Sequence, residues 1–299
     1  MRILVTGVNG QLGSELIQTL SKSGHTVIGT ARRTDTLSSL PGVSYTVLDL
    51  TETDRILPVL EGAAPDAVIH CASYVAVDRA EEEKKLCFLT NETATEIIAK
   101  YCGQKDIPLL YTSTDYVFDG SGERPFTTTD IPNPLNVYGA SKYAGELAVS
   151  RFAPKHFIVR ICWTYAVNGT NFVNTMLSLA NTRDTLSVVT DQFGSPTYIP
   201  DLTPLLGDMI ESDRYGIYHA ANSGYCSRYE LALEIFRLAK LPVTVLPIES
   251  SAFHGKAHRP KNCRLNTDAL VTNGFSKLPS WQDGLRRFFC EVNLWENLQ

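Results

Sequence analysis

Short apolar segments alternate with amphipathic segments along the first half of the chain. Helical spacing of apolar residues between the short segments predicts helices over residues 13–23, 54–61, 80–103 and 138–150. The short segments have the composition of strands buried on both faces, and they cover residues 2–6, 25–30, 44–48, 67–71, 109–112 and 156–160. Such alternation predicts right-handed crossovers and a parallel sheet with helices on both faces.

The pattern becomes less regular after residue 160. We expect a helix over 171–181, a loop over 191–200 and a strand that returns to the sheet near 216–221. The rest of the second half contains many Pro and Gly residues. The sequence therefore predicts an α/β fold, with a doubly wound parallel sheet over residues 1–163 and a smaller C-terminal lobe formed mainly by 164–299.

Composition narrows the class of protein. The chain has 299 residues, of which 43% are hydrophobic and 20% charged, so it can bury a core. The net charge is −5 and no basic run occurs, which argues against nucleic-acid binding. The seven cysteines are odd in number and lack metal-ligand spacing, so we expect reduced thiols, a cytoplasmic location and no metal site. No signal peptide or membrane-length apolar segment is evident.

A glycine-rich turn follows the first predicted strand and opens the first helix. Glycines allow the backbone to turn tightly and approach a pyrophosphate, while the helix N-terminus offers free N–H groups. The spacing predicts a dinucleotide site, and so a Rossmann-type domain over 1–163; an empty glycine-rich turn is the alternative. The candidate residues are Gly7, Asn9, Gly10, Gln11, Leu12 and Gly13.

Residues after the second strand indicate which dinucleotide binds. NAD-binding proteins place an acid there for the ribose 2′-hydroxyl, whereas this chain has Arg32 and Arg33. Guanidinium groups suit a 2′-phosphate, so NADPH is favoured and NADH is expected to bind more weakly. The alternative is a solvated basic loop. Further candidates for cofactor contact follow the third and fourth strands, namely Asp49, Leu50, Cys71, Ala72 and Ser73.

Tyr138 and Lys142 stand four residues apart, on one face of a predicted helix. The ammonium is expected to lower the phenol pKa from about 10 and so make Tyr138 a proton donor near neutral pH, in contact with cofactor as well. Thr114, near the end of the fifth strand, offers a hydroxyl to the substrate oxygen. Tyr101 and Lys105 repeat the spacing, but we interpret them as structural because they lie near the end of a helix broken at Gly103.

The combination of glycine turn, Thr114, Tyr138 and Lys142 resembles the extended short-chain dehydrogenases/reductases. The chain is more specifically similar to the dTDP-4-dehydrorhamnose reductase family. The strings that carry this resemblance span nearly the whole chain and begin at Ala76, Ser113, Pro134, Asn171, Asp191 and Arg259, where they read AVDRAE, STDYVF, PLNVYG, NFV, DQFGSPT and RP.

This resemblance implies NADPH-dependent reduction of the C4 keto group of a dTDP-4-keto-6-deoxy sugar, most specifically dTDP-4-dehydrorhamnose to dTDP-L-rhamnose. Thr114, Tyr138 and Lys142 would carry the reaction. The substrate would contact Trp163, Asn171, Gln192 and Arg259, with Asn171 and Arg259 at its diphosphate. Trp163 as a core residue and Arg259 as a surface cation are the alternatives.

Some relatives dimerise through carboxylates around a metal. Glu15 and Glu291 stand at matching positions, but the third position is Pro200. The resemblance thus allows a homodimer without supplying a complete metal site.

Two other functions are compatible with the fold. A nucleotide-sugar epimerase or dehydratase would use the same Tyr–Lys pair, but related dehydratases carry Asp-Glu after the Thr, and here Asp115 is followed by Tyr116. Those enzymes also retain NAD, which the two arginines disfavour. A non-catalytic subunit similar to the regulatory β-subunit of methionine adenosyltransferase is the other alternative, because it keeps similar Tyr and Lys positions.

Overall fold

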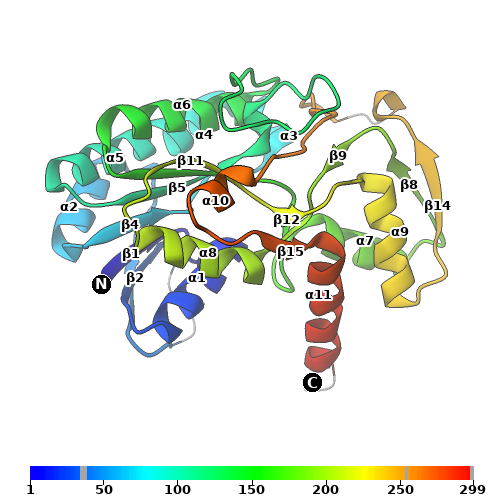
Figure 1. Cartoon of the computed structure of the whole chain (residues 1–299), viewed down its shortest axis with the longest axis horizontal. Helices are drawn as coiled ribbons and strands as arrows, with labels where there is room; N and C mark the ends of the chain where they lie inside the picture. Colours follow the sequence, from blue (N-terminus) through cyan, green and yellow to red (C-terminus); the bar gives the residue numbers. More distant parts are fainter. Residues whose placement is uncertain (34–38, 253–254, 297–299) are drawn as a thin grey trace.

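The structure is a computed structural model that describes residues 1–33, 39–252 and 255–296. Its central feature is a seven-stranded parallel sheet with the order β11-β6-β5-β4-β1-β2-β3 (Figure 1). The strands are β1 (Arg2–Thr6), β2 (Thr26–Ala31), β3 (Val43–Val47), β4 (Ala67–His70), β5 (Leu109–Thr114), β6 (His156–Ile161) and β11 (Gly216–Ala220). The predicted strands and the doubly wound parallel sheet are confirmed, and β5 extends two residues beyond its predicted end, to Thr114.

Helices cover both faces of this sheet. One face packs on α1 (Gln11–Lys22), α8 (Ile199–Ile210) and α10 (Asp268–Thr272). The other packs on α2 (Thr53–Ala63), α5 (Ala94–Lys105) and α6 (Val137–Phe152). The apolar residues of β1 divide between the two layers, with Ile3 and Val5 in the first core and Leu4 in the second. Burial on both faces explains why these strands are continuously apolar rather than alternating.

A smaller lobe lies beyond the carboxyl ends of the strands, to the right in Figure 1. It has its own apolar core, which includes Leu186, Leu231 and Phe288. The paired strands β8 (Thr185–Val189) and β14 (Thr244–Ile248) lie beside α7 (Phe172–Ala180) and α9 (Arg228–Ala239), and α11 (Trp281–Glu296) packs next to α9. Short two-stranded pairs connect the layers: β7 (Thr164–Tyr165) with β10 (Thr197–Tyr198), β9 (Phe193–Gly194) with β13 (Cys226–Ser227), and β12 (Asn222–Ser223) with β15 (Leu278–Ser280).

The second half of the chain returns to the sheet more than once. Besides the expected strand β11, helices α8 and α10 pack against the same apolar layer as Ile3 and Val5. The division into 1–163 and 164–299 stays a prediction, and the sheet layer draws on both parts of it.

The segment predicted as one helix over 80–103 differs from that prediction. It comprises α3 (Val77–Ala80), α4 (Lys84–Phe88), a π-helical turn over Leu89–Thr93 and then α5. The buried Asn91 lies in the π turn, where its amide bonds the backbone of Tyr74 and the hydroxyl of Ser141. A wider turn lets this side chain reach neighbours that regular helical geometry would not offer.

Gly103 also differs from its prediction, because α5 continues through it to Lys105. A Cβ at Gly103 would lie 1.9 Å from the carbonyl oxygen of Phe152, so this glycine permits close helix packing. The Tyr101 hydroxyl donates to the Leu60 carbonyl at 3.0 Å within the core. A structural role for Tyr101 is therefore consistent with the geometry.

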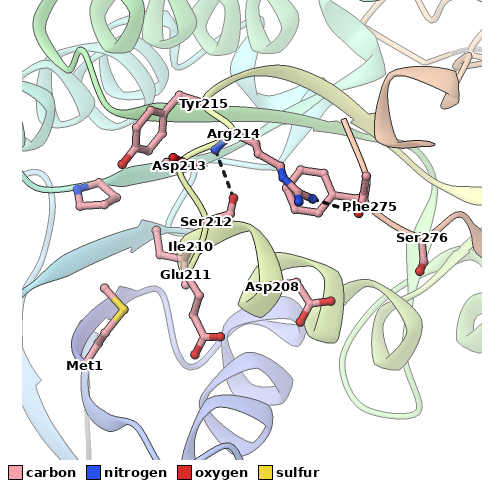
Figure 2. Close-up of a pocket in the computed structure, with 12 residues that line it drawn as sticks. Met1, Asp208, Ile210, Glu211, Ser212, Asp213, Arg214, Tyr215, Phe275 and Ser276 are labelled. Atoms are coloured by element: carbon pink, nitrogen blue, oxygen red, sulfur yellow. Dashed lines mark hydrogen bonds between the residues drawn. The ribbon is translucent and has the colours of Figure 1, made fainter. Parts of the chain in front are cut away.

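A hollow of about 770 Å³ opens at the amino edge of the sheet. Met1 precedes β1 there, and the segment from Glu211 to Tyr215 precedes β11 (Figure 2). Arg214 spans part of the hollow and donates to the Gly274 carbonyl at 3.0 Å. The predicted catalytic side chains lie at the opposite edge, where ligands bind in open α/β sheets, so we do not assign this hollow to the active site.

Candidate active site

The glycine-rich turn forms a close-packed cradle between β1 and α1. Gly7 has φ +77°, and a Cβ there would lie 2.7 Å from the Cα of Ala72. A Cβ on Gly13 would lie 2.4 Å from the Gly7 carbonyl oxygen. Both glycines are therefore required by the turn itself, and Gly10 at the N-cap of α1 makes no side-chain cap. The first N–H groups of α1 remain available to an anion such as a pyrophosphate.

Two basic side chains flank the cradle. Arg32 and Arg33 are exposed just after β2, and Asn9 donates from Nδ2 to the Arg33 carbonyl at 2.8 Å. This bond fixes the backbone of the basic pair next to the glycine turn. The arrangement suits a 2′-phosphate, although direct contact with cofactor stays a prediction.

The end of β4 lies on the other side of the cradle. The Ala72 N–H donates to the Thr6 hydroxyl at 3.0 Å, and Ser73 donates to Asn91 at 3.0 Å. Burial raises the pKa of the partly buried Cys71 to about 12, so its thiol is neutral. These contacts keep the end of β4 beside Gly7, and the contact of Cys71, Ala72 and Ser73 with cofactor stays a prediction.

Asp49 and Leu50 follow β3. Asp49 accepts from the backbone and the hydroxyl of Thr51 in a local turn, and Leu50 is buried against the α2–α5 layer. These interactions do not test the predicted contact of Asp49 and Leu50 with the cofactor, which stays a prediction.

Tyr138 lies in the first turn of α6, and several contacts fix that turn. Asn136 caps the helix by accepting from the Gly139 N–H at 2.8 Å, and the Val137 N–H donates to Glu81 at 2.8 Å. Gly139 is required because a Cβ would lie 2.1 Å from the Tyr116 carbonyl oxygen. The phenol ring of Tyr138 contacts the Tyr116 ring edge-on, with centroids 5.8 Å apart.

Lys142 lies one turn further along α6 and is 2% exposed. Its ammonium donates to the Thr112 carbonyl at 2.7 Å and lies 4.0 Å from the centroid of the Tyr111 ring. Burial lowers the pKa of Lys142 to about 7, and the nearby Glu146 carboxylate raises it in opposition. Lys142 also acts electrostatically on Cys71, which follows β4.

The phenol pKa differs from our expectation. Burial raises the pKa of Tyr138 above its usual value, and a hydrogen bond with Thr114 lowers it in part. The ammonium of Lys142 interacts instead with the Thr112 carbonyl and the Tyr111 ring. The protein alone therefore keeps Tyr138 protonated, which is the form a proton donor needs.

Thr114 is buried at the carboxyl end of β5, together with Asp115. The Thr114 hydroxyl donates to Asp115 Oδ1 at 3.0 Å and accepts from the Tyr116 N–H at 3.2 Å. Asp115 is 3% exposed, burial raises its pKa, and its Oδ2 has no hydrogen-bond partner among the described residues. In the sequence, Asp115 served only to argue against a dehydratase. No neighbouring residue in the sequence indicates that one of its oxygens is unpaired.

Trp163 follows β6 with φ +44°, an unusual conformation for a bulky residue. Its ring packs on Gly194, where a Cβ would come within 2.7 Å. The Arg228 guanidinium lies 3.6 Å from the Trp163 ring centroid, and the Arg228 N–H donates to the Gln192 carbonyl at 3.1 Å. Two predicted substrate residues, Trp163 and Gln192, thus meet at one place, together with an arginine that the sequence did not single out.

The two residues predicted for the diphosphate already have partners. Asn171 caps α7 through its Oδ1, while its Nδ2 donates to Gln11 and to the Ala166 carbonyl, each at 2.9 Å. Arg259 pairs with Asp78 at 2.5 Å, which joins two of the strings that carry the family resemblance. Their contact with substrate stays a prediction.

Glu15 and Glu291 lie close enough that Glu291 contributes to the raised pKa of Glu15, after burial. Tyr198 donates to Glu291, and Pro200 lies in the first turn of α8. Within residues 1–33, 39–252 and 255–296, no cluster of three or more His, Cys, Asp or Glu side chains is arranged to hold a metal ion. No helix in these ranges is long and apolar enough to span a bilayer.

Comparisons with known proteins agree on one family. The family model described as RmlD substrate binding domain matches residues 1–294. The chain is 35% identical to the dTDP-4-dehydrorhamnose reductase of Escherichia coli K12, with 98% of each chain covered, and 32% identical to a dTDP-4-keto-6-deoxy-D-glucose reductase of Streptomyces niveus, with 99% of each covered.

A solved structure gives the same result. The Bacillus anthracis dTDP-4-dehydrorhamnose reductase, crystallised in complex with NADP, superimposes with a TM-score of 0.90 at 39% identity, covering 97% of this chain and 99% of that one. The family resemblance drawn from the sequence motifs is confirmed.

Proposed function

The chain belongs to the RmlD substrate-binding-domain family, and from this we propose that it is an NADPH-dependent reductase of a dTDP-4-keto-6-deoxy sugar. It is similar to named dTDP-4-dehydrorhamnose reductases over nearly its whole length. The most specific form of the proposal is conversion of dTDP-4-dehydrorhamnose to dTDP-L-rhamnose. The observation that supports it best is the set of Thr114, Tyr138 and Lys142 at the same sheet edge as the glycine cradle.

The residues present fit the cofactor. The turn packs too closely to accept a Cβ at Gly7 or Gly13, and it leaves the first N–H groups of α1 free to hold a pyrophosphate. Arg32 and Arg33 would hold the 2′-phosphate, and Lys142 and Tyr138 are the predicted contacts of the cofactor on α6. When bound, the nicotinamide supplies a hydride to the carbonyl carbon.

The chain's own groups then handle the proton. Tyr138 donates its phenolic proton to the C4 oxygen, whose electron pair is released from the carbonyl π bond. Thr114 holds the same oxygen through its hydroxyl and also bonds the Tyr138 phenol, while the Lys142 ammonium, held on the Thr112 carbonyl, supplies positive charge one turn further along α6. Burial supports this assignment, because a raised pKa keeps the Tyr138 proton in place until it is transferred.

The alternative enzyme class, a nucleotide-sugar dehydratase, lacks a group that its reaction needs. Elimination requires an additional acid and base beside the sugar, and the position after Asp115 is Tyr116, whose pKa burial raises far above neutrality. A phenol held protonated cannot act as the base at neutral pH. Net reduction therefore fits the site better than dehydration.

Product analysis tests the proposal. The protein would be mixed with dTDP-4-dehydrorhamnose and NADPH, and the sugar nucleotides separated. We expect one reduced 6-deoxy sugar per NADPH consumed. Epimerised or dehydrated product without net NADPH consumption would overturn the reaction class. The opposite C4 configuration would overturn the rhamnose assignment alone, and cofactor binding without turnover would favour a regulatory subunit.

Replacing Arg32 and Arg33 together by Ala should weaken NADPH much more than NADH. A charge-assisted hydrogen bond contributes about 1.5–3 kcal/mol, so KM for NADPH should rise at least about tenfold. Steady-state kinetics with each cofactor would measure this. Arg286→Ala, which removes an exposed charge on α11, is the control. Equal losses with both cofactors would show that the two arginines face solvent.

A cytoplasmic location and a homodimer complete the proposal. Both derive from the sequence and the family resemblance, and no partner subunit enters the chemistry described above.

A further inference from the structure

Arg228 has no ion-pair partner among the described residues, although its charge acts on the Asp115 carboxyl. It opens α9 directly after Ser227, whose capping box with Glu230 fixes the first helical turn. Glu230 is occupied by that cap through the backbone and hydroxyl of Ser227. Among the described residues, no carboxylate lies within ion-pair distance of Arg228, whereas Arg237, on the same helix, pairs with Glu234 at 2.7 Å.

The guanidinium of Arg228 is held by aromatic rings. It lies 3.6 Å from the centroid of Trp163 and 4.8 Å from that of Phe172. Stacking of this kind occupies the flat faces of the guanidinium and leaves its N–H donors at the edge. In the described part of the chain, no side chain or carbonyl accepts a hydrogen bond from those donors. The guanidinium is therefore held in one orientation, while its N–H donors have no acceptor among the described residues.

Trp163 is a fixed platform for this stack. Its backbone is held at φ +44°, its carbonyl accepts from the Thr197 N–H at 3.1 Å, and its indole packs against Gly194. The N–H of Arg228 is also tied to the Gln192 carbonyl. Little conformational freedom remains to be lost when a ligand meets the guanidinium, which favours affinity.

The charge of Arg228 reaches the reacting end of the site. It lowers the pKa of both Asp115 and Tyr116, in each case against the larger effect of burial. Tyr116 in turn contacts the Tyr138 ring. Arg228, on α9 of the smaller lobe, is therefore close enough to the catalytic residues to act electrostatically on their neighbours.

We propose that Arg228, stacked on Trp163, binds the diphosphate of the nucleotide-sugar substrate. The inference rests on the proposed function. A diphosphate requires positive charge and several hydrogen-bond donors, and Arg228 offers both without first breaking an ion pair. Arg259 is already paired with Asp78, and the amide of Asn171 is used in capping α7 and bonding Gln11.

Binding of dTDP and of thymidine separates this role from simple packing. Arg228→Met keeps an unbranched side chain over Trp163 but removes the charge and the donors. Its affinity for dTDP, measured by titration calorimetry, should fall about tenfold to a hundredfold, while its affinity for thymidine changes little. Arg237→Met, which removes a paired charge from the same helix, should leave both affinities unchanged.

Arg228→Lys provides a second variant. It keeps the charge but loses the planar fork, so dTDP affinity should lie between wild type and Arg228→Met. Unchanged NADPH affinity in each variant reports an intact fold. If Arg228→Met loses NADPH affinity, its fold is disturbed and Arg228→Lys becomes the test. The inference then requires that Arg228→Lys binds dTDP more weakly than the wild type while its thymidine affinity stays unchanged.

Three results would overturn the inference: unchanged dTDP affinity, equal losses for dTDP and thymidine, or no dTDP binding by the wild type. Because binding is measured without turnover, the test is distinct from that of the proposed function. A wild type that binds dTDP through Arg228 yet reduces no 4-keto sugar would overturn the reaction while leaving this site in place.

Discussion

Tyr138→Phe is expected to lower turnover by about a hundredfold or more while NADPH binding stays near that of the wild type. Proton transfer by a positioned side chain contributes about 10²–10⁴-fold, and the variant removes the proton but keeps the ring. The ring contact with Tyr116 would be retained, so the first turn of α6 should keep its place. Single-turnover reduction of the 4-keto sugar, with cofactor affinity measured in parallel, would test this.

The chain supplies a matched control for this variant. Tyr101→Phe makes the same change at the other Tyr-to-Lys spacing, where the hydroxyl only bonds the Leu60 carbonyl. It should cost about 1 kcal/mol of stability and leave turnover intact. Near-normal turnover in Tyr138→Phe would remove Tyr138 from the proton-donor role.

Arg160→Met is expected to lower the free energy of unfolding by about 3–5 kcal/mol. Arg160 and Glu146 are both nearly fully buried and form two hydrogen bonds, at 2.9 and 2.7 Å, between β6 and α6. Removing the guanidinium leaves the Glu146 carboxylate buried with only the Ser113 hydroxyl to satisfy it. Urea unfolding, monitored by circular dichroism, would measure the change.

Two further variants define the cause of that loss. Arg55→Met removes an exposed partner of Glu52 and should cost no more than about 1 kcal/mol. Replacing Glu146 by Leu together with Arg160 by Met should recover part of the loss, because neither member of the ion pair then remains buried without its partner. A double variant less stable than Arg160→Met would contradict this explanation.

The elements that follow from local pattern were predictable from the sequence. The strands at Arg2–Thr6 and Leu109–Thr114 are apolar because both sheet faces are covered, and the glycine spacing at Gly7 and Gly13 is imposed by backbone contacts within one turn. Tyr138 and Lys142 could be found because their relation is set by one helix. Each of these signals lies within a few residues of chain.

What the sequence could not predict depends on contacts between distant segments. The π turn at Leu89–Thr93 forms around Asn91, whose partners Tyr74 and Ser141 lie well away along the chain. Arg228 looks like any arginine at a helix start until the fold places it on Trp163 without a carboxylate. Local spacing also could not show that the amide of Asn171 is used in capping and in bonding Gln11.

The position of β11 has a consequence for protein synthesis. Because this strand is formed by Gly216–Ala220 and pairs with β6, the ribosome must deliver more than two-thirds of the chain before the sheet reaches its final width. Until then β6 is an edge strand with unpaired backbone groups, and α8 joins the apolar layer only shortly before β11 is made. A fragment that stops near Trp163 would share that open edge and would also lack α8, so we expect it to fold poorly when it is excised and fused elsewhere.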